Sequence, residues 1–408
     1  MTSPVGLMVR ASLGLGFALG LGLGAGCVAR PAPPPPLPSA VTAATALVPT
    51  GAPDAAGLLD DGDHESLRAA VRESLAWLDT QPPDRALVFG PRTVAAGAHR
   101  QALRHLLAML ADDPPADVLA ARVLREFEPL RSIGATDGSV LFTGYHEPVI
   151  DAVEHPDPTF PVPILGLPDD LIEVALEAFD PRFRGERIFG RLDGPRLVPY
   201  WTRAEIEAGQ LRARAPVLAW ARDPVDAFFM EIQGSGTLRL PDGREVRVGY
   251  AAANGRAYRS IGRLLIDEGH LAQEAVSLQT IRAWLAAHPE ERARVLRYNE
   301  SYVFFRRLDG PPLGSLGVPV SPGRSIATDP RLFPPAALAF VRTDRPRRAA
   351  DGRIAWLPLR RFVLNQDAGG AIRGPDRVDL FWGRGADAEL AAGLMKQPGE
   401  LYFLAPRR

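Results

Sequence analysis

The sequence has very little cysteine and lysine, and each shortage excludes something. Cys27 is the single cysteine in 408 residues, so the folded part of the chain has no intramolecular disulfide and depends on its core. Lys396 is the single lysine, and nearly all positive charge is therefore arginine. Because the formal net charge is only −1, the basic excess that is typical of nucleic-acid-binding proteins is also missing.

The N-terminal segment lacks the roughly 20 consecutive apolar residues that a spanning helix needs. A short stretch with one arginine precedes a glycine-rich apolar run, Ser12–Ala25, and small residues then lead to Cys27. This order resembles the lipobox of a bacterial lipoprotein, although Gly24 stands where a larger aliphatic residue is usual. We therefore predict a signal peptide over residues 1–27 and a lipid on Cys27. The alternative is an ordinary signal peptide with an incidental cysteine.

Residues 28–56 are rich in proline and alanine, with four consecutive prolines from Pro33 to Pro36. Such a composition cannot bury a core and predicts a semi-extended tether. The remaining length is enough for two domains, or for one domain with a large insertion.

Hydrophobic periodicity predicts helices over Glu65–Asp79, Val94–Leu110 and Pro115–Phe127. Further helices are predicted over Asp169–Phe179, after a capping box at Thr202 and Glu205, from Ser260 and over Leu278–Ala287. The apolar run Asp226–Ile232 is interpreted as a buried strand. A hairpin is predicted across Pro241-Asp242-Gly243, between the runs 237–240 and 245–248.

The most informative stretch, residues 365–384, holds one aspartate at the end of each of two strand-like runs. Asp367 follows an apolar run, and Asp379 begins the strand-like run Leu380–Trp382 twelve positions later. Gly369, Gly370 and Gly374 lie between them and allow the backbone to pass close to a ligand. Paired carboxylates in different environments are the usual means of cutting a glycosidic bond.

Specific motifs surround these aspartates. The pattern D-x-G-G-A-I-x-G followed by D-L-F-W-G resembles the C-terminal three-aspartate domain of the membrane-bound lytic murein transglycosylase A family. The third aspartate of that family lies in D-P-x-x-x-P, and Asp329 stands there in this chain. Ala368, where the family usually has threonine, and Pro335-Ala336, where it usually has Leu-Gly, depart from the pattern and affect turn geometry.

Other blocks extend the resemblance from about Leu141 to Leu404, in the order of the family. The block T-G-Y-x-x-P-V-I holds Thr143 and Tyr145, the block I-Q-G-S-G holds Gln233, and N-x-S-Y-V-F-F holds Asn299 and Tyr302. The resemblance implies that these five side chains contact sugar. The alternatives are an exposed aromatic at a strand end for Tyr145, a turn-capping side chain for Gln233 and core aromatics near Tyr302.

The fold implied by the resemblance is mainly β with helices. A catalytic double-psi β-barrel would be built from residues 57–148 and 310–408. A second β-barrel, residues 149–309, would be inserted into it. A glycan strand would bind in the groove between the two domains.

The reaction implied by the resemblance is non-hydrolytic cleavage of the β-1,4 bond between N-acetylmuramic acid and N-acetylglucosamine. Asp379, among apolar neighbours, would protonate the leaving oxygen and then take the proton of the muramic C6 hydroxyl. Asp367 would orient the site or stabilise charge, and Asp329 would shape the pocket. No metal and no cofactor are implied.

The implied partners are glycan strands of peptidoglycan and the membrane through the lipid anchor, at the periplasmic face of the outer membrane. Other enzymes of cell-wall synthesis or hydrolysis remain open as partners. Two rival functions also remain open: a glycan-binding lipoprotein without turnover, and a hydrolase that uses water. Ser235 lacks the G-x-S-x-G context of a nucleophile, and His146-Glu147 lacks the second histidine of a zinc motif.

Overall fold

The computed structural model describes residues 41–49, 53–183, 185–370 and 372–407. The predicted signal peptide, Cys27 and the tether up to residue 40 lie outside the described residues. Part of the predicted tether is structured, because Leu47–Pro49 forms strand β1, which pairs with β4, Phe127–Ser132. No helix within the described ranges is both long and apolar enough to cross a membrane.

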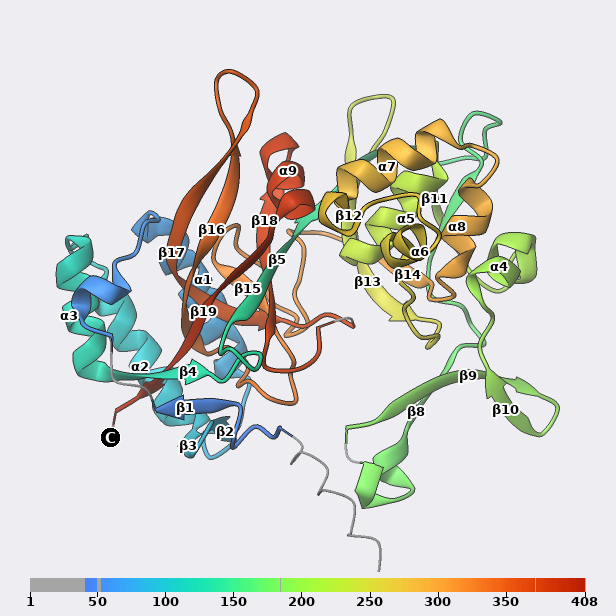
Figure 1. The fold of residues 1–408 in the computed structure, drawn as a ribbon. Coiled ribbons are helices and arrows are strands. Elements are labelled where there is room, and N and C mark those ends of the chain that lie inside the picture. The colour runs from blue at the N-terminus through green and yellow to red at the C-terminus, as the bar shows by residue number, and fades with distance from the viewer. Residues whose placement is uncertain (1–40, 50–52, 184, 371, 408) are drawn as a thin grey trace, which may run out of the picture. The chain divides into compact units, whose positions relative to one another are not determined.

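Six strands close into a barrel that contains the C-terminal part of the chain (Figure 1). Their order is β19-β16-β17-β15-β18-β5, and β5 pairs back with β19. Two of the neighbour pairs, β15 with β17 and β18 with β5, are parallel. The strands are β5 (Val140–Glu147), β15 (Ser325–Ala327), β16 (Leu338–Arg348), β17 (Ile354–Asp367), β18 (Arg377–Arg384) and β19 (Lys396–Pro406).

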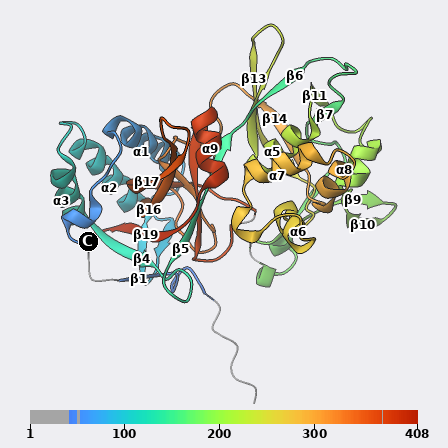
Figure 2. The same cartoon turned by 45° about the horizontal axis from the view of Figure 1, so that its top comes forward.

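Helices from the N-terminal part of the chain lie beside this barrel (Figure 2). They are α1 (His64–Asp79), α2 (Ala96–Met109) and α3 (Ala116–Glu126), with the hairpin β2–β3 (Ala86–Phe89, Arg92–Ala95) between the first two. One hydrophobic core joins apolar side chains of residues 46–142 with those of residues 326–405. The two ends of the described chain therefore fold together, and the short helix α9, Ala386–Leu394, contacts β5 and β18.

A second sheet contains the middle of the chain. Its order is β14-β13-β12-β6-β11-β7, and a single bridge between Gly166 and Phe305 connects its two edges. Its strands are β6 (Val149–Val153), β7 (Val162–Leu165), β11 (Val217–Ala221), β12 (Ser235–Arg239), β13 (Glu245–Ala253) and β14 (Val303–Leu308). The accompanying helices are α4 (Arg203–Glu205), α5 (Pro224–Gln233), α6 (Ile261–Asp267), α7 (Leu278–Ala287) and α8 (Arg292–Tyr298).

The fold is thus mainly β with helices, as predicted. The three N-terminal helices, the hairpin across 241–243, the Thr202–Glu205 capping box and the Ser260 cap are also confirmed. The double-psi crossing of the strands and the barrel nature of the second sheet stay predictions.

Two local predictions are wrong. The run 226–232 is helix α5 rather than a strand, because Asp223 accepts from the N–H of Val225, Pro224 occupies the first turn and Gly234 ends the helix at φ +76°. Residues 169–179 form strand β8, Ile172–Ala175, and one 3₁₀ turn rather than a helix. Short alternating strands of this kind are easily mistaken for helices, since both place apolar residues at close intervals.

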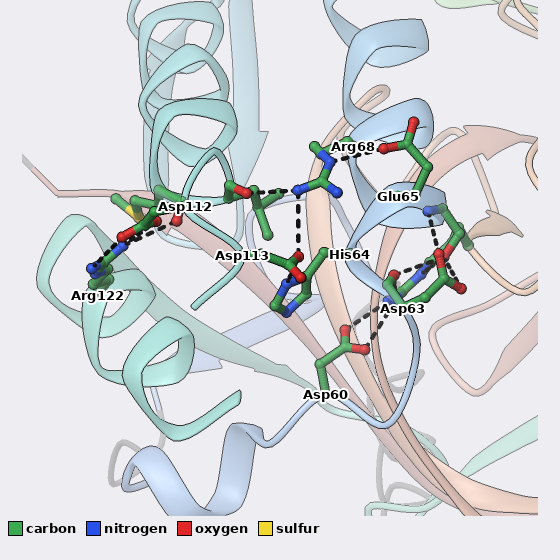
Figure 3. A network of polar contacts seen from close by, with 12 residues as sticks. Asp60, Asp63, His64, Glu65, Arg68, Asp112, Asp113 and Arg122 are labelled. Atoms are coloured by element: carbon green, nitrogen blue, oxygen red, sulfur yellow. Dashed lines mark hydrogen bonds and ion pairs between the residues drawn. The ribbon is translucent and has the colours of Figure 1, made fainter. Parts of the chain in front are cut away.

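Polar contacts join the start of α1 to the residues that follow α2 (Figure 3): His64 Nδ1 lies 2.8 Å from Asp113 Oδ1, and Arg68 donates to the carbonyl oxygen of Leu110 at 2.7 Å. A second set of contacts, around Asp60, fixes α1 to the barrel. The Asp60 carboxylate accepts two hydrogen bonds from the buried Arg324 guanidinium, at 2.6 and 3.0 Å, and a third from the N–H of Phe362. Asp63 caps α1. Because Arg324 directly precedes β15 and Phe362 lies in β17, the acidic run at residues 60–63 supports two neighbouring barrel strands.

Candidate active site

The two aspartates of the C-terminal motif lie on one row that crosses four neighbouring strands. Ala327 of β15 is the Cα partner of Asp367 in β17 and also of Asp379 in β18. Thr143 of β5 is in turn the partner of Asp379. Since neighbouring strands lie about 4.8 Å apart, the Cα atoms of the aspartates are separated by roughly 10 Å, with Ala327 between them in the row.

Asp379 is anchored on one side and open on the other. The Thr143 hydroxyl donates a hydrogen bond to Oδ1 of Asp379, and Arg377 Nε lies 3.5 Å from the same oxygen. Within the described residues, Oδ2 accepts no hydrogen bond, and the side chain is 17% exposed. One carboxyl oxygen is therefore held by the protein while the other remains accessible.

Asp367 is surrounded by donors. Tyr145 donates from its hydroxyl to Oδ2 at 2.8 Å, and the N–H groups of Ser315 and Ala368 donate to Oδ1, each at 2.8 Å. Burial nevertheless raises the pKa of Asp367, the negative charge of Asp379 raises it further, and the three donors oppose this shift. The two carboxyl groups thus interact electrostatically from different environments.

The Tyr145 side chain extends from β5 past β18, the strand that holds Asp379, to Asp367 in β17. It packs on Phe381 with ring centroids 5.1 Å apart, and Phe381 is its partner on β18. Burial, followed by the charge of Asp367, raises the pKa of Tyr145 well above its ordinary value, so this hydroxyl remains a donor at neutral pH. Tyr145 therefore fixes the carboxyl of Asp367 from the far side of β18.

Asp329 holds the loop between the aspartates. Its carboxylate accepts from Arg331 Nε at 2.9 Å and Nη2 at 2.6 Å, and from the N–H of Gly374 at 3.0 Å. Burial favours the neutral acid, but the Arg331 and Gly374 donors outweigh it and lower the pKa of Asp329 to about 2. Asp329 is therefore ionised at neutral pH.

Comparison with known proteins places this site in a family. The chain matches the model of the MltA specific insert domain over residues 141–306 and that of the 3D domain over residues 324–405. It is 34% identical over 274 residues to membrane-bound lytic murein transglycosylase A of Vibrio cholerae, covering 66% of this chain and 67% of the relative. This chain belongs to the membrane-bound lytic murein transglycosylase A family.

Solved structures agree with this assignment. A membrane-bound lytic murein transglycosylase from Agrobacterium tumefaciens superposes with a TM-score of 0.74 at 30% identity, covering 89% of this chain and 98% of that one. Escherichia coli MltA with bound chitohexaose superposes with a TM-score of 0.68 at 26% identity, covering 90% and 96% of the two chains.

The remaining predicted sugar-contact residues of this transglycosylase family member lie on the second sheet and its helices. Gln233, at the end of α5, accepts a hydrogen bond on Oε1 from the N–H of His146 at 2.8 Å, so it links α5 to β5. Asn299 is 1% exposed and accepts from the N–H groups of Arg259 and Ser301. These two side chains are thus already used within the protein.

Tyr302 lies in a hydrophobic core and is 7% exposed. Its ring packs against Phe304, and the guanidinium of the buried Arg203 lies over it at 5.1 Å from the centroid. Both Asn299 and Tyr302 would need to become more exposed before either could contact a glycan.

The structure adds two site residues that the sequence interpretation missed. Ser315 donates its backbone N–H to Asp367, and Ala327 separates the two aspartates. Neither has a side chain that signals this role, because both act through backbone position. In the described part of the chain no group of three or more His, Cys, Asp or Glu side chains could hold a metal ion. Two shallow surface hollows around Pro156 and Asp157 lie outside this site.

Proposed function

We propose that this protein is a peptidoglycan lytic transglycosylase. It cleaves the β-1,4 bond between N-acetylmuramic acid and N-acetylglucosamine and leaves 1,6-anhydromuramoyl ends. The observation that carries the proposal is Asp379, held by Thr143 through Oδ1 with Oδ2 open, on the same row as Asp367. The chitohexaose bound to the E. coli relative supports a glycan as the ligand here as well.

Asp379 acts first as the acid and then as the base. Its proton goes to the leaving glycosidic oxygen as the bond from that oxygen to muramic C1 breaks. The carboxylate that results takes the proton of the C6 hydroxyl, and O6 bonds to C1. One carboxyl suffices for both steps because water is not the nucleophile, in contrast to two-carboxylate hydrolases.

The other aspartates support this chemistry without exchanging the proton. Asp367 stabilises positive charge that develops at C1 and keeps the site oriented through Tyr145. Asp329, ionised beside Arg331, fixes the loop at Gly374 and shapes the pocket.

Sugar contacts are proposed for Thr143, Tyr145 and Gln233, whose side chains are partly exposed. For Asn299 and Tyr302 the same proposal requires that they become accessible when a glycan binds.

We also propose the domain organisation that goes with this function. The closed six-stranded barrel is the double-psi barrel of residues 57–148 and 310–408, and the second sheet is a barrel inserted at residues 149–309. The membrane association in the relatives' name supports lipidation at Cys27 and a place at the periplasmic face of the outer membrane.

Mass spectrometry of sacculi digested by the purified protein tests the reaction. The expected products are muropeptides with 1,6-anhydromuramic ends, which are lighter by one water than those with reducing ends. Reducing ends would show a hydrolase instead. A protein that binds sacculi and releases nothing would show the binding lipoprotein.

A further inference from the structure

A small three-stranded sheet has one apolar face and one polar face. It consists of β8, β9 (Arg187–Asp193) and β10 (Arg196–Pro199), in the order β10-β9-β8 (Figure 1). From the registers, one face presents Ile172, Val174, Ile188, Leu192, Leu197 and Pro199. The opposite face presents mainly charged side chains, among them Glu173, Arg187, Arg191, Asp193 and Arg196.

The centre of the polar face, at Arg191 and Phe189, packs toward the protein, whereas Glu173, Arg187, Asp193 and Arg196 around it are exposed. The Arg191 guanidinium lies 3.7 Å from the ring centroid of Trp201. Phe189 lies against Gly255, where a Cβ atom would come within 2.7 Å of the Phe189 Cβ atom. An amphipathic antiparallel sheet normally places its apolar face against the core and its polar face in water.

The part of the apolar face on β9 and β10 is exposed to solvent, whereas Ile172 and Val174 on β8 are half-buried. Ile188 is 45% exposed, Leu192 is 62% exposed and Leu197 is 40% exposed. Among the described residues, none of these three belongs to any of the hydrophobic cores. Exposed apolar side chains on one face of a sheet are a feature of protein or membrane contact sites.

We propose that the apolar face of β8–β10 docks on the surface of the membrane that anchors the protein. A glycan does not fit it, because these aliphatic side chains offer no donors or acceptors to sugar hydroxyls. The sheet itself satisfies the backbone groups of β9 through its pairing with both neighbours, so shallow burial in the headgroup region leaves that central strand paired.

The choice of a membrane as partner rests on the proposed lipid anchor at Cys27. Val41, where the described chain begins, follows Cys27 by fourteen positions, and fourteen residues span at most about 50 Å. The folded part therefore stays within that distance of the bilayer. Strand β1, which follows Val41, and the three-stranded sheet both lie in the lower part of Figure 1.

Site-specific labelling tests the contact directly. The lipidated protein has no free thiol, since Cys27 is its single cysteine, so Leu197→Cys and Arg196→Cys each place one polarity-sensitive dye on opposite faces of the sheet. In phosphatidylcholine vesicles we expect a blue shift and quenching by a bilayer-embedded quencher at position 197 only. Equal signals at both positions would overturn the proposal. A shift at position 197 without vesicles, accompanied by dimers in solution, would also overturn it and would assign the face to a second copy.

A second experiment separates this surface from the lipid anchor. The chain without residues 1–27 carries neither the lipid nor the apolar signal run, so its partition into zwitterionic vesicles reports the sheet. Adding Leu192→Asp and Leu197→Asp should lower this partition roughly 100-fold, because two leucine side chains no longer leave water. The matched control, Arg196→Asp on the polar face, should not change it. Partition that is insensitive to both leucines would overturn the proposal.

The lipid itself is checked separately, by the mass of the mature N-terminal peptide, so failure of the anchor and failure of the sheet give different results. The Leu192→Asp, Leu197→Asp variant should digest purified sacculi, in the absence of membranes, at the same rate as the parent chain, because the sheet is outside the active site. Loss of that digestion together with loss of the folded circular-dichroism spectrum would show a structural role and overturn the proposal.

Discussion

Tyr145 donates a hydrogen bond from its hydroxyl to Asp367 Oδ2 at 2.8 Å, although 222 positions separate the two residues. The bond connects β5 with β17 across the strand that holds Asp379. It places one aromatic ring beside both carboxyl groups, so the charge of Asp379 also raises the pKa of Tyr145. The geometry of the acid site thus depends on the joining of the N-terminal and C-terminal parts of the barrel.

Asp367→Asn should stabilise the fold at neutral pH while reducing turnover. Burial raises the pKa of Asp367, so its favourable contribution to folding exists below its ordinary value of 3.8 and is lost as the pH rises through the raised value. The neutral amide avoids this cost at pH 7. Urea unfolding should give the variant an equal or higher free energy of unfolding at pH 7.

The advantage of Asp367→Asn should shrink as the pH falls through the raised pKa of Asp367, where this side chain becomes protonated in the folded protein, and it should level off below 3.8. A variant that is much less stable than the parent at pH 7 would contradict this. It would show that the three donors to Asp367 require a carboxylate.

Asp329→Asn should show the opposite pH dependence. The pKa of Asp329 is lowered from 3.8 to about 2, so its stabilising contribution is present above pH 3.8 and disappears as the pH falls through 2. The shift corresponds to at most about 2.5 kcal/mol at pH 7. Unfolding free energies of parent and variant should differ by that order at pH 7.

The two unfolding free energies should converge near pH 2. Arg331→Gln, which removes the ion-pair partner of Asp329, is the matched variant and should reproduce part of the loss. An unfolding free energy of Asp329→Asn equal to that of the parent at pH 7 would show that the contacts of Asp329 with Arg331 and Gly374 contribute nothing to stability.

The sequence identified the aspartates but not their arrangement. Asp329, Asp367 and Asp379 stand out because glycines and apolar strands surround them. The register that makes Ala327 the partner of both Asp367 and Asp379 depends on pairing between strands far apart in the sequence. Local patterns carry no information on such pairing, since register follows from the packing of the whole sheet.

Helices could be predicted from the sequence where the residues that cap their ends were considered. The helix α6 begins after the predicted cap at Ser260, and α7 has the predicted bounds, Leu278–Ala287. Helix α5 was mistaken for a strand because its run is apolar on most sides, with Phe228, Phe229 and Met230 all buried. The signals that identify it as a helix, Asp223 and Pro224 before it and Gly234 after it, were present in the sequence.

Gln233→Ala should lower stability as well as glycan binding. The truncation leaves the backbone N–H of His146 without its acceptor, and an unpaired buried donor costs roughly 1–3 kcal/mol. Gln233→Glu retains an acceptor and is the matched control, which should restore stability. Thermal unfolding and a sacculus-binding assay measure the two effects separately. An alanine variant with unchanged melting temperature and weak binding would show that Gln233 serves only the sugar.

Cys27→Ala should release the protein from the membrane fraction into the soluble periplasm, or block its maturation. The reason is the loss of the lipid attachment site at the end of the apolar signal run. Cell fractionation followed by immunoblotting measures the change. If the variant still sediments with membranes to the same extent as the parent, lipidation at Cys27 is not the anchor.

Asp379→Asn should abolish turnover and preserve both the fold and glycan binding. The amide oxygen still accepts the hydrogen bond from Thr143, so the side chain keeps its place beside Ala327. It has no proton to give to the leaving oxygen, and loss of general acid–base catalysis typically costs roughly 10²–10⁴-fold. We expect the loss of rate to lie at or above the upper end of this range, because the same carboxyl group also serves as the base.

The measurement is the rate of anhydromuropeptide release from purified sacculi, with binding assayed on the same samples. Asp367→Asn is the matched control. It removes a charge from the same row of residues but leaves the acid in place, so its defect should be smaller. Turnover near the parent rate in Asp379→Asn, or a larger defect in Asp367→Asn, would transfer the acid–base role to Asp367, whose pKa burial already raises.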